Sequence, residues 1–177
     1  GSSIRRHVRN RRLNADNLPV AGRPVMPVGY GLDAAEKFQP IAWEWVSQQL
    51  SDARNYWIAT TRLSGKPHVS PVWGLWLNGR VMFATDAEST KARNAARNPA
   101  CSIHLESGDE VVIVDGELQR VTDESTLKSF NEAYDTKYDL NPGAGTAIAP
   151  VFALKMNVVL AWHESDFPST ATRWKFD

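Results

Sequence analysis

Asn78-Gly79 is the feature of this sequence that most restricts its fold, because this dipeptide favours two-residue turns between antiparallel strands. Segments with the pattern of strands flank it, His68–Leu77 before and Arg80–Thr85 after. A second turn signal, Ser64-Gly65-Lys66-Pro67, separates His68–Leu77 from the β-branched and aromatic run Tyr56–Thr61. The sequence therefore predicts a run of consecutive antiparallel strands.

The rest of the chain predicts further strands and a few short helices. Strands are expected over Ala100–Leu105, Glu110–Val121 and Val151–Trp162, and Gly116 is expected to form a bulge. Helices are expected from Pro40 to Asp52, from an N-cap at Ser89 to Asn98-Pro99, and from a cap at Thr122 with an apolar stripe of Leu127, Phe130, Tyr134 and Tyr138. This order indicates an α+β fold, mainly antiparallel β, with a small closed barrel.

The segment before the first helix has a different character. Residues 1–37 lack a sustained period and form an Arg-rich N-terminal arm, whereas residues 38–177 form the barrel domain. Six arginines lie within residues 1–23, against Asp16 alone. The arm could attract a polyanion such as an acidic cofactor tail, or it could be a passive extension. Its arginines are not interleaved with aromatic residues, so no nucleic acid partner is expected.

The strand His68–Leu77 presents two different faces. Val69, Pro71, Trp73, Leu75 and Leu77 are predicted to face the core. The other face begins with His68 and Ser70, which are small or polar. Side chains of this kind are typical of a surface that a planar ligand approaches closely. The alternative is that this second face is open to solvent.

The segment from Ala84 to Asn94 carries the clearest indication of a binding site. A strand ends there and feeds a helix N-terminus, where open N–H groups and the helix dipole favour an anion. Lys91 and Arg93 add whole positive charges. Residues two apart do not share a helix face, so both can contact one anion only if Lys91 lies in the loop or the first turn. The segment is thus either an anion site or a solvated surface helix.

Other classes of site are not indicated. The sequence has no G-x-G-x-x-G after a strand, no phosphate-binding Walker loop and no histidine spacing typical of a metal site. Since no general acid or base can be assigned, a bound cofactor would have to supply any reaction and the catalytic residues stay unassigned. The single Cys101 suits a reducing, cytoplasmic location, and no apolar run reaches the roughly 18 residues of a membrane span.

Several stretches together resemble the pyridoxamine 5'-phosphate oxidase-like split β-barrel flavoproteins. Ala59-Thr60-Thr61 with Gly65–Trp73 is similar to their opening hairpin, and Ser89–Asn94 with Asn98-Pro99 is similar to their phosphate-binding segment. Glu110–Val121 resembles their fourth-to-fifth strand region, and Thr172-Arg173-Trp174 resembles their C-terminal signature. The Lys-x-Arg-Asn form and the Arg-Trp tail are most similar to the branch that uses the deazaflavin coenzyme F420.

The resemblance implies a homodimer with the cofactor in a groove between subunits. Ser89, Lys91, Arg93 and Asn94 would hold the phosphate. The ring would be lined by His68, Ser70, Pro71, Val72 and Trp73, with Ala84 and Thr85, and Trp174 would approach from the partner's tail. Thr90 stands where pyridoxamine-phosphate oxidases carry Arg, and their C-terminal substrate pattern is missing, which speaks against pyridoxine chemistry.

The activity implied is transfer of a hydride between reduced F420 and an organic small-molecule acceptor. The alternatives are an FMN-dependent oxidase or reductase of the same fold, and a flavin-, F420- or haem-binding protein without turnover.

Overall fold

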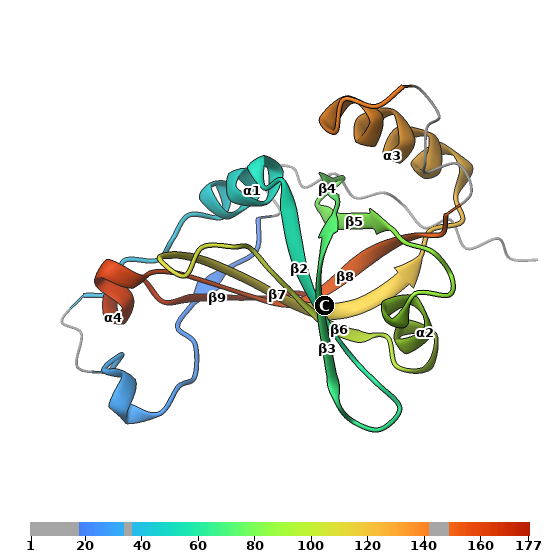
Figure 1. The fold of residues 1–177 in the computed structure, drawn as a ribbon. Helices are drawn as coiled ribbons and strands as arrows, with labels where there is room; N and C mark the ends of the chain where they lie inside the picture. The colour runs from blue at the N-terminus through green and yellow to red at the C-terminus, as the bar shows by residue number, and fades with distance from the viewer. Residues whose placement is uncertain (1–17, 34–36, 142–148) are drawn as a thin grey trace, which may run out of the picture.

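The computed structural model describes residues 18–33, 37–141 and 149–177. Its strands form one antiparallel sheet in the order β1-β9-β8-β7-β6-β2-β3, and β5 joins β4 to β8 (Figure 1). The strands are β1 (Ala21–Gly22), β2 (Asn55–Thr61), β3 (Pro67–Trp73), β4 (Leu75–Leu77), β5 (Arg80–Ala84), β6 (Ala100–His104), β7 (Glu110–Arg120), β8 (Val151–His163) and β9 (Thr172–Lys175). The predicted α+β, mainly antiparallel architecture of a split β-barrel is confirmed.

Short helices lie around this sheet. They are η2 (Val28–Tyr30), α1 (Trp43–Asp52), α2 (Thr90–Arg97), α3 (Glu124–Lys137), η3 (Glu164–Asp166) and α4 (Phe167–Thr170). Helix α1 begins at Trp43 rather than at the predicted Pro40. No helix in the described ranges is long and apolar enough to cross a membrane.

The turn signals and the bulge signal act as predicted. Asn78 and Gly79 both have positive φ, 53° and 71°, and they join β4 to β5. The register of β7 against β8 shifts between Asp115 and Gly116. A Cβ atom at Gly116 would lie 2.1 Å from the carbonyl oxygen of Lys155, so only glycine fits this close approach.

The predicted strand His68–Leu77 is broken at Gly74 into β3 and β4. A Cβ atom there would lie 2.8 Å from the carbonyl oxygen of Met82. The end of α3 anchors the break: Lys137 Nζ donates to the Gly74 carbonyl at 2.7 Å, and the Gly74 N–H donates to the Tyr138 hydroxyl at 2.8 Å. The break lets the chain pass from the edge of the sheet to the hairpin that packs under α3.

The two faces of β3 were predicted the wrong way round. Val69 and Trp73 are 53% and 39% exposed and Pro71 is exposed, while Val72 is buried in the core. His68 and Ser70 point to the same side as Val72. The alternation of side chains along a strand predicts two faces, but the curvature of the barrel decides which face is interior. The apolar residues lie on the outer face, where Tyr138 stacks on Trp73 and Val69 stays exposed.

Asp123, not the predicted Thr122, caps helix α3. The Asp123 carboxylate accepts from the backbone N–H of Thr126 at 2.9 Å and from its hydroxyl at 2.6 Å. It also accepts from the Ser125 hydroxyl at 2.8 Å. Three such bonds make a carboxylate a stronger cap than the neighbouring hydroxyl would be.

Asp123→Ala is therefore expected to lower the melting temperature, and Thr122→Ala is expected to leave it unchanged. Hydrogen bonds from Thr126 and Ser125 lower the pKa of Asp123. Because the folded pKa lies below the unfolded one, this stabilisation is present above about pH 4 and is lost as the pH falls through the lowered pKa. Thermal melts between pH 3 and pH 7 test this, and an equal loss in both variants would contradict it.

Both ends of the described chain lie on the sheet. The C-terminal tail lies in the sheet, because β9 pairs with β8 on one side and with β1 on the other. Of the predicted N-terminal arm, residues 18–33 include β1 and η2, while residues 1–17 lie outside the described residues.

Candidate functional site

The turn from β5 into α2 builds a small polar cluster. The Ser89 hydroxyl caps α2 by accepting the N–H of Ala92 at 3.2 Å, as predicted. The Thr85 hydroxyl donates to the Ser89 hydroxyl at 3.1 Å, and Lys91 Nζ donates to the Thr85 hydroxyl oxygen at 3.4 Å. Lys91 therefore lies in the first turn of α2 with its ammonium beside the strand end, which is the position that an anion site requires.

Helix α2 lies against the barrel beside the interior face of β3. Asn94 Nδ2 donates to the Thr60 hydroxyl at 3.0 Å, which ties α2 to β2. Thr60 is in turn paired with His68 across β2 and β3. Lys91 and Asn94 are three residues apart and share a helix face, so Lys91 points toward the same side.

Two buried polar atoms on that face of β3 lack a partner. The Nδ1 atom of His68 and the hydroxyl of Ser70 have no hydrogen-bond partner among the described residues. A buried polar atom without a partner is costly and rare, so it points to a group that binds there. We define the anion seat as His68, Thr85, Ser89 and Lys91, with Ser70 next to His68 along the strand face.

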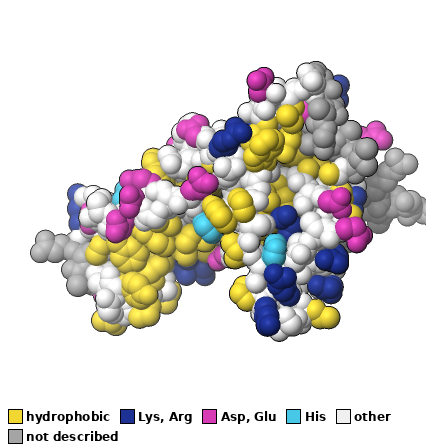
Figure 2. Space-filling model, in the orientation of Figure 1, with side chains coloured by type: hydrophobic (Ala, Val, Ile, Leu, Met, Phe, Trp, Pro, Cys, Tyr) yellow, Lys and Arg dark blue, Asp and Glu magenta, His cyan; other side chains and the backbone are white. Residues whose placement is uncertain are grey.

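The electrostatics of the seat are positive. Burial lowers the pKa of His68, and the charges of Arg62 and Lys91 lower it further. Figure 2 shows Lys and Arg side chains gathered over the β2–β3 hairpin and α2, on the face that the view presents. An anion between these groups would relieve their mutual repulsion.

Several predicted site residues lie elsewhere. Asn94 is only 1% exposed and holds α2 against β2, so it positions the helix rather than the phosphate. Arg93 is exposed and two residues from Lys91, which places it on a different face of α2. Ala84, half-buried, packs against the apolar cluster under α3. Of the predicted site residues, the structure thus brings together His68, Ser70, Thr85, Ser89 and Lys91.

Trp174 also lies away from the seat. Its side chain is 1% exposed, and its ring packs edge-on against Trp43 with centroids 5.4 Å apart. The tail signature that suggested a ring contact is explained within one chain by packing in the barrel core. Within one chain Trp174 is therefore a core residue, and its approach to a cofactor from the partner's tail stays a prediction.

Pro71 and Trp73 lie on the outer face of β3. Trp73 stacks in parallel on Tyr138 with ring centroids 4.3 Å apart, and the Arg54 guanidinium lies 5.4 Å from the Trp73 ring. These contacts leave Trp73 partly exposed at the edge of the sheet. It could line a groove only if a second molecule covered this face.

Arg62 is a residue of the site that the sequence analysis missed. It follows β2 in the turn before β3, and its charge reaches His68. The available signal was the pair of cations, Arg62 and Lys66, that flanks the turn Ser64-Gly65. Because the turn folds back over the strand ends, a cation there lies close to α2.

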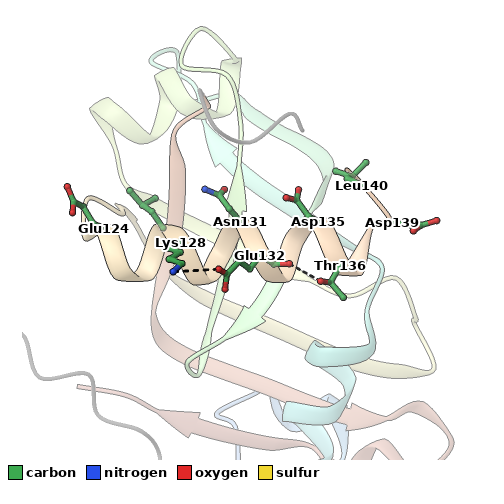
Figure 3. A pocket seen from close by; sticks show the side chains of 9 residues that line it. Glu124, Lys128, Asn131, Glu132, Asp135, Thr136, Asp139 and Leu140 are labelled. Carbon is green, nitrogen blue, oxygen red and sulfur yellow. Dashed lines mark hydrogen bonds and ion pairs between the residues drawn. The ribbon is translucent and has the colours of Figure 1, made fainter. Parts of the chain in front are cut away.

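Two further features do not belong to this site. A groove of about 800 Å³ runs along α3, lined mainly by polar side chains such as Asn131, Asp135 and Lys128, and none of the seat residues lines it (Figure 3). Burial, followed by the charge of Asp115, raises the pKa of the Cys101 thiol to about 12, so this cysteine is not a nucleophile. The described residues also hold no group of three or more His, Cys, Asp or Glu side chains suited to a metal ion.

Solved structures share this fold. A conserved hypothetical protein of Mycobacterium tuberculosis aligns over 73% of this chain and 88% of its own, with a TM-score of 0.64 and 19% identity. A structure described as an F420 reductase aligns over 64% and 94%, with a TM-score of 0.53 and 22% identity. A haem-binding protein of Mycobacterium smegmatis aligns over 66% and 52%, with a TM-score of 0.53 and 17% identity. At these identities the likeness shows the fold alone.

The comparison with protein families is more specific. No curated protein matches the sequence. The family described as Pyridoxamine 5'-phosphate oxidase matches residues 43–163, which span α1, the whole barrel from β2 to β8, and the seat. The match covers more than half of the chain, and the chain therefore belongs to the pyridoxamine 5'-phosphate oxidase family.

Proposed function

We propose that this chain is an oxidoreductase that binds the deazaflavin F420 and transfers a hydride between it and a small organic acceptor. The observation that carries the proposal is the anion seat, where a lysine, a capped helix N-terminus and unpartnered polar atoms converge. These groups fit the phosphate of such a cofactor. Lys91 would donate to it as a cation, and the His68 ring and the Ser70 hydroxyl would gain the partner they lack.

The bound deazaflavin would supply the hydride chemistry, and the chain's own residues would bind and orient it. The interior face of β3 leads from the seat past Ser70 and Val72 to the break at Gly74. A ring beside the phosphate would meet Ser70 and the strand backbone next to it, because Val72 is packed in the core. We assign no general acid or base to the reaction.

FMN is the alternative cofactor, since its phosphate would suit the same cations and the family is described by a flavin enzyme. F420 is favoured because its branch is the one that the segment Lys91–Asn94 resembles, and because a structure of similar fold is an F420 reductase. A haem-binding protein of similar fold supports a third possibility, binding without turnover.

Paired fluorescence titrations with F420 and FMN test the proposal. We expect saturable quenching with F420 and weaker quenching with FMN. Tighter binding of FMN would show that FMN is the cofactor. If neither cofactor binds, the proposed function is refuted. A protein that binds F420 but does not oxidise its reduced form with any acceptor in a quinone and nitroaromatic panel would be a binding protein.

We propose further that the protein is a homodimer through the outer face of β3. Val69, Pro71 and Trp73 are exposed there beside Trp57, which stacks on His104. An apolar sheet face of this kind is usually covered, and a two-fold partner would cover it twice.

Val69→Asp is therefore expected to convert a dimer into a monomer, because a buried carboxylate opposite an apolar surface is costly. Val25→Asp is the matched control, since Val25 is 86% exposed on the N-terminal segment away from β3. Light scattering at micromolar concentration checks both. A monomeric wild-type protein would contradict the proposed assembly.

A further inference from the structure

We propose that His68 is a titrating ligand of the anion seat, taking up one proton when an anion binds, so that the seat distinguishes a phosphodiester from a phosphomonoester by the pH dependence of binding. This role of His68 rests on the proposed function, which supplies the identity of the cofactor. Its geometric basis is the seat itself.

The position of His68 makes it a ligand rather than a structural residue. Its Nδ1 atom is buried yet finds no hydrogen-bond partner in the described part of the chain. A neutral imidazole has one donor and one acceptor nitrogen, and only the protonated ring donates from both. An anion in the seat can accept a hydrogen bond from the neutral or the protonated ring of His68. Only the protonated ring also attracts the anion with a full positive charge.

The charged groups that act on His68 are cations. Arg62 comes from the turn before β3 and Lys91 comes from α2, and both oppose protonation of the ring. The facing residues of β2 and α2, Thr60 and Asn94, are neutral and bonded to each other. The other charged residues of these segments are exposed: Lys66, Asp86, Glu88, Arg93 and Arg97. The Asp86 carboxylate accepts from the Glu88 N–H at 2.7 Å, and the Arg97 guanidinium donates to Asn94 Oδ1 at 3.2 Å.

The sign of the coupling follows from these charges. In the free protein, burial first and then the charges of Arg62 and Lys91 lower the pKa of His68, which favours the neutral ring. A nearby anion favours the charged form and raises this pKa. Binding therefore takes up a proton, and affinity increases as the pH falls from the raised pKa toward the lowered one. Each pKa unit between the free and the bound protein corresponds to about a tenfold change in affinity.

The type of phosphate decides how this coupling appears. The phosphate of F420 is bonded on both sides and keeps one charge between pH 5 and pH 8. A phosphomonoester such as FMN gives up its second charge as the pH falls through about 6, which opposes the gain at His68. F420 affinity should thus rise steadily toward low pH, whereas FMN affinity should change little.

Binding titrations between pH 8 and pH 5.5 at constant ionic strength provide the first test. Wild-type protein should bind F420 about tenfold more tightly at the lower pH, and His68→Gln should show no such change. His68→Lys, which carries a charge throughout, should bind tightly across the range. His104→Gln is the matched control, because His104 lies on the outer face of β6 against Trp57. A slope that survives in His68→Gln, or a flat wild-type profile, would overturn the inference.

Sulfate separates this inference from the choice of cofactor, since it keeps its two charges throughout this pH range. NMR titration of the His68 ring proton should show a higher pKa in saturating sulfate than in chloride, and Lys91→Ala should reduce the difference. If sulfate raises this pKa but F420 does not bind, the cofactor is wrong and the coupling stands. If F420 binding depends on Lys91 but neither ligand moves the His68 pKa, the coupling is wrong and the function stands.

Discussion

Lys91→Ala is expected to weaken F420 binding about 10- to 100-fold, the largest functional loss among single substitutions in the seat. A charge-assisted hydrogen bond to a phosphate contributes on the order of 1.5–3 kcal/mol. The only hydrogen bond that Lys91 makes to the described residues is the long one to Thr85, at 3.4 Å, so the fold should not depend on it. Melting temperature should stay close to that of the wild type.

The matched control is Lys128→Ala, because Lys128 is 78% exposed on α3 and contacts only Glu132 at 4.0 Å. It should bind F420 as the wild type does, at low and at high salt. Arg93→Ala should cause a smaller loss than Lys91→Ala, since Arg93 lies on another face of α2. Equal affinities of Lys91→Ala and wild type in fluorescence titrations would show that the phosphate lies elsewhere.

Trp174→Ala is expected to have the largest effect on stability, a loss of about 3–5 kcal/mol in the free energy of unfolding. The Trp174 ring projects from β9 into the barrel core against Trp43, and it is one of the largest fully buried side chains described. Urea denaturation measures the loss. Trp174→Phe keeps a ring in the core and should retain most of the stability.

The Trp174→Phe variant also separates the core role from the role that the family resemblance implied. If Trp174 only fills the core, this variant binds F420 with wild-type affinity. A large loss of affinity at nearly unchanged stability would mean that Trp174 contacts the cofactor, against the burial seen here.

The parts of the fold predicted from sequence are those fixed by local chemistry. Asn78-Gly79 has the backbone freedom that a tight hairpin needs, Gly116 fits where Lys155 comes close, and Ser89 caps α2 whatever its surroundings. Each signal acts within a few residues or on one neighbouring strand. The same reasoning singled out Lys91, and the structure places it in the first turn of α2.

The errors arise where tertiary packing decides. The alternation in β3 is correct, yet the apolar set Val69, Pro71 and Trp73 lies outside, because the barrel closes on the side of His68 and Val72. Asn94 and Trp174 are suitable residue types for a binding site, and only their burial shows that they serve the fold. Arg62 was missed because its approach to His68 depends on how the hairpin folds over α2.

A crystal structure of the protein with F420 bound is the most direct test of the central claim. The account predicts the cofactor phosphate within hydrogen-bond distance of Lys91 Nζ and the His68 ring, at the N-terminus of α2, with the deazaflavin ring along the interior face of β3. A phosphate bound away from Lys91, or a ring on the outer face of β3 beside Trp73, would contradict it.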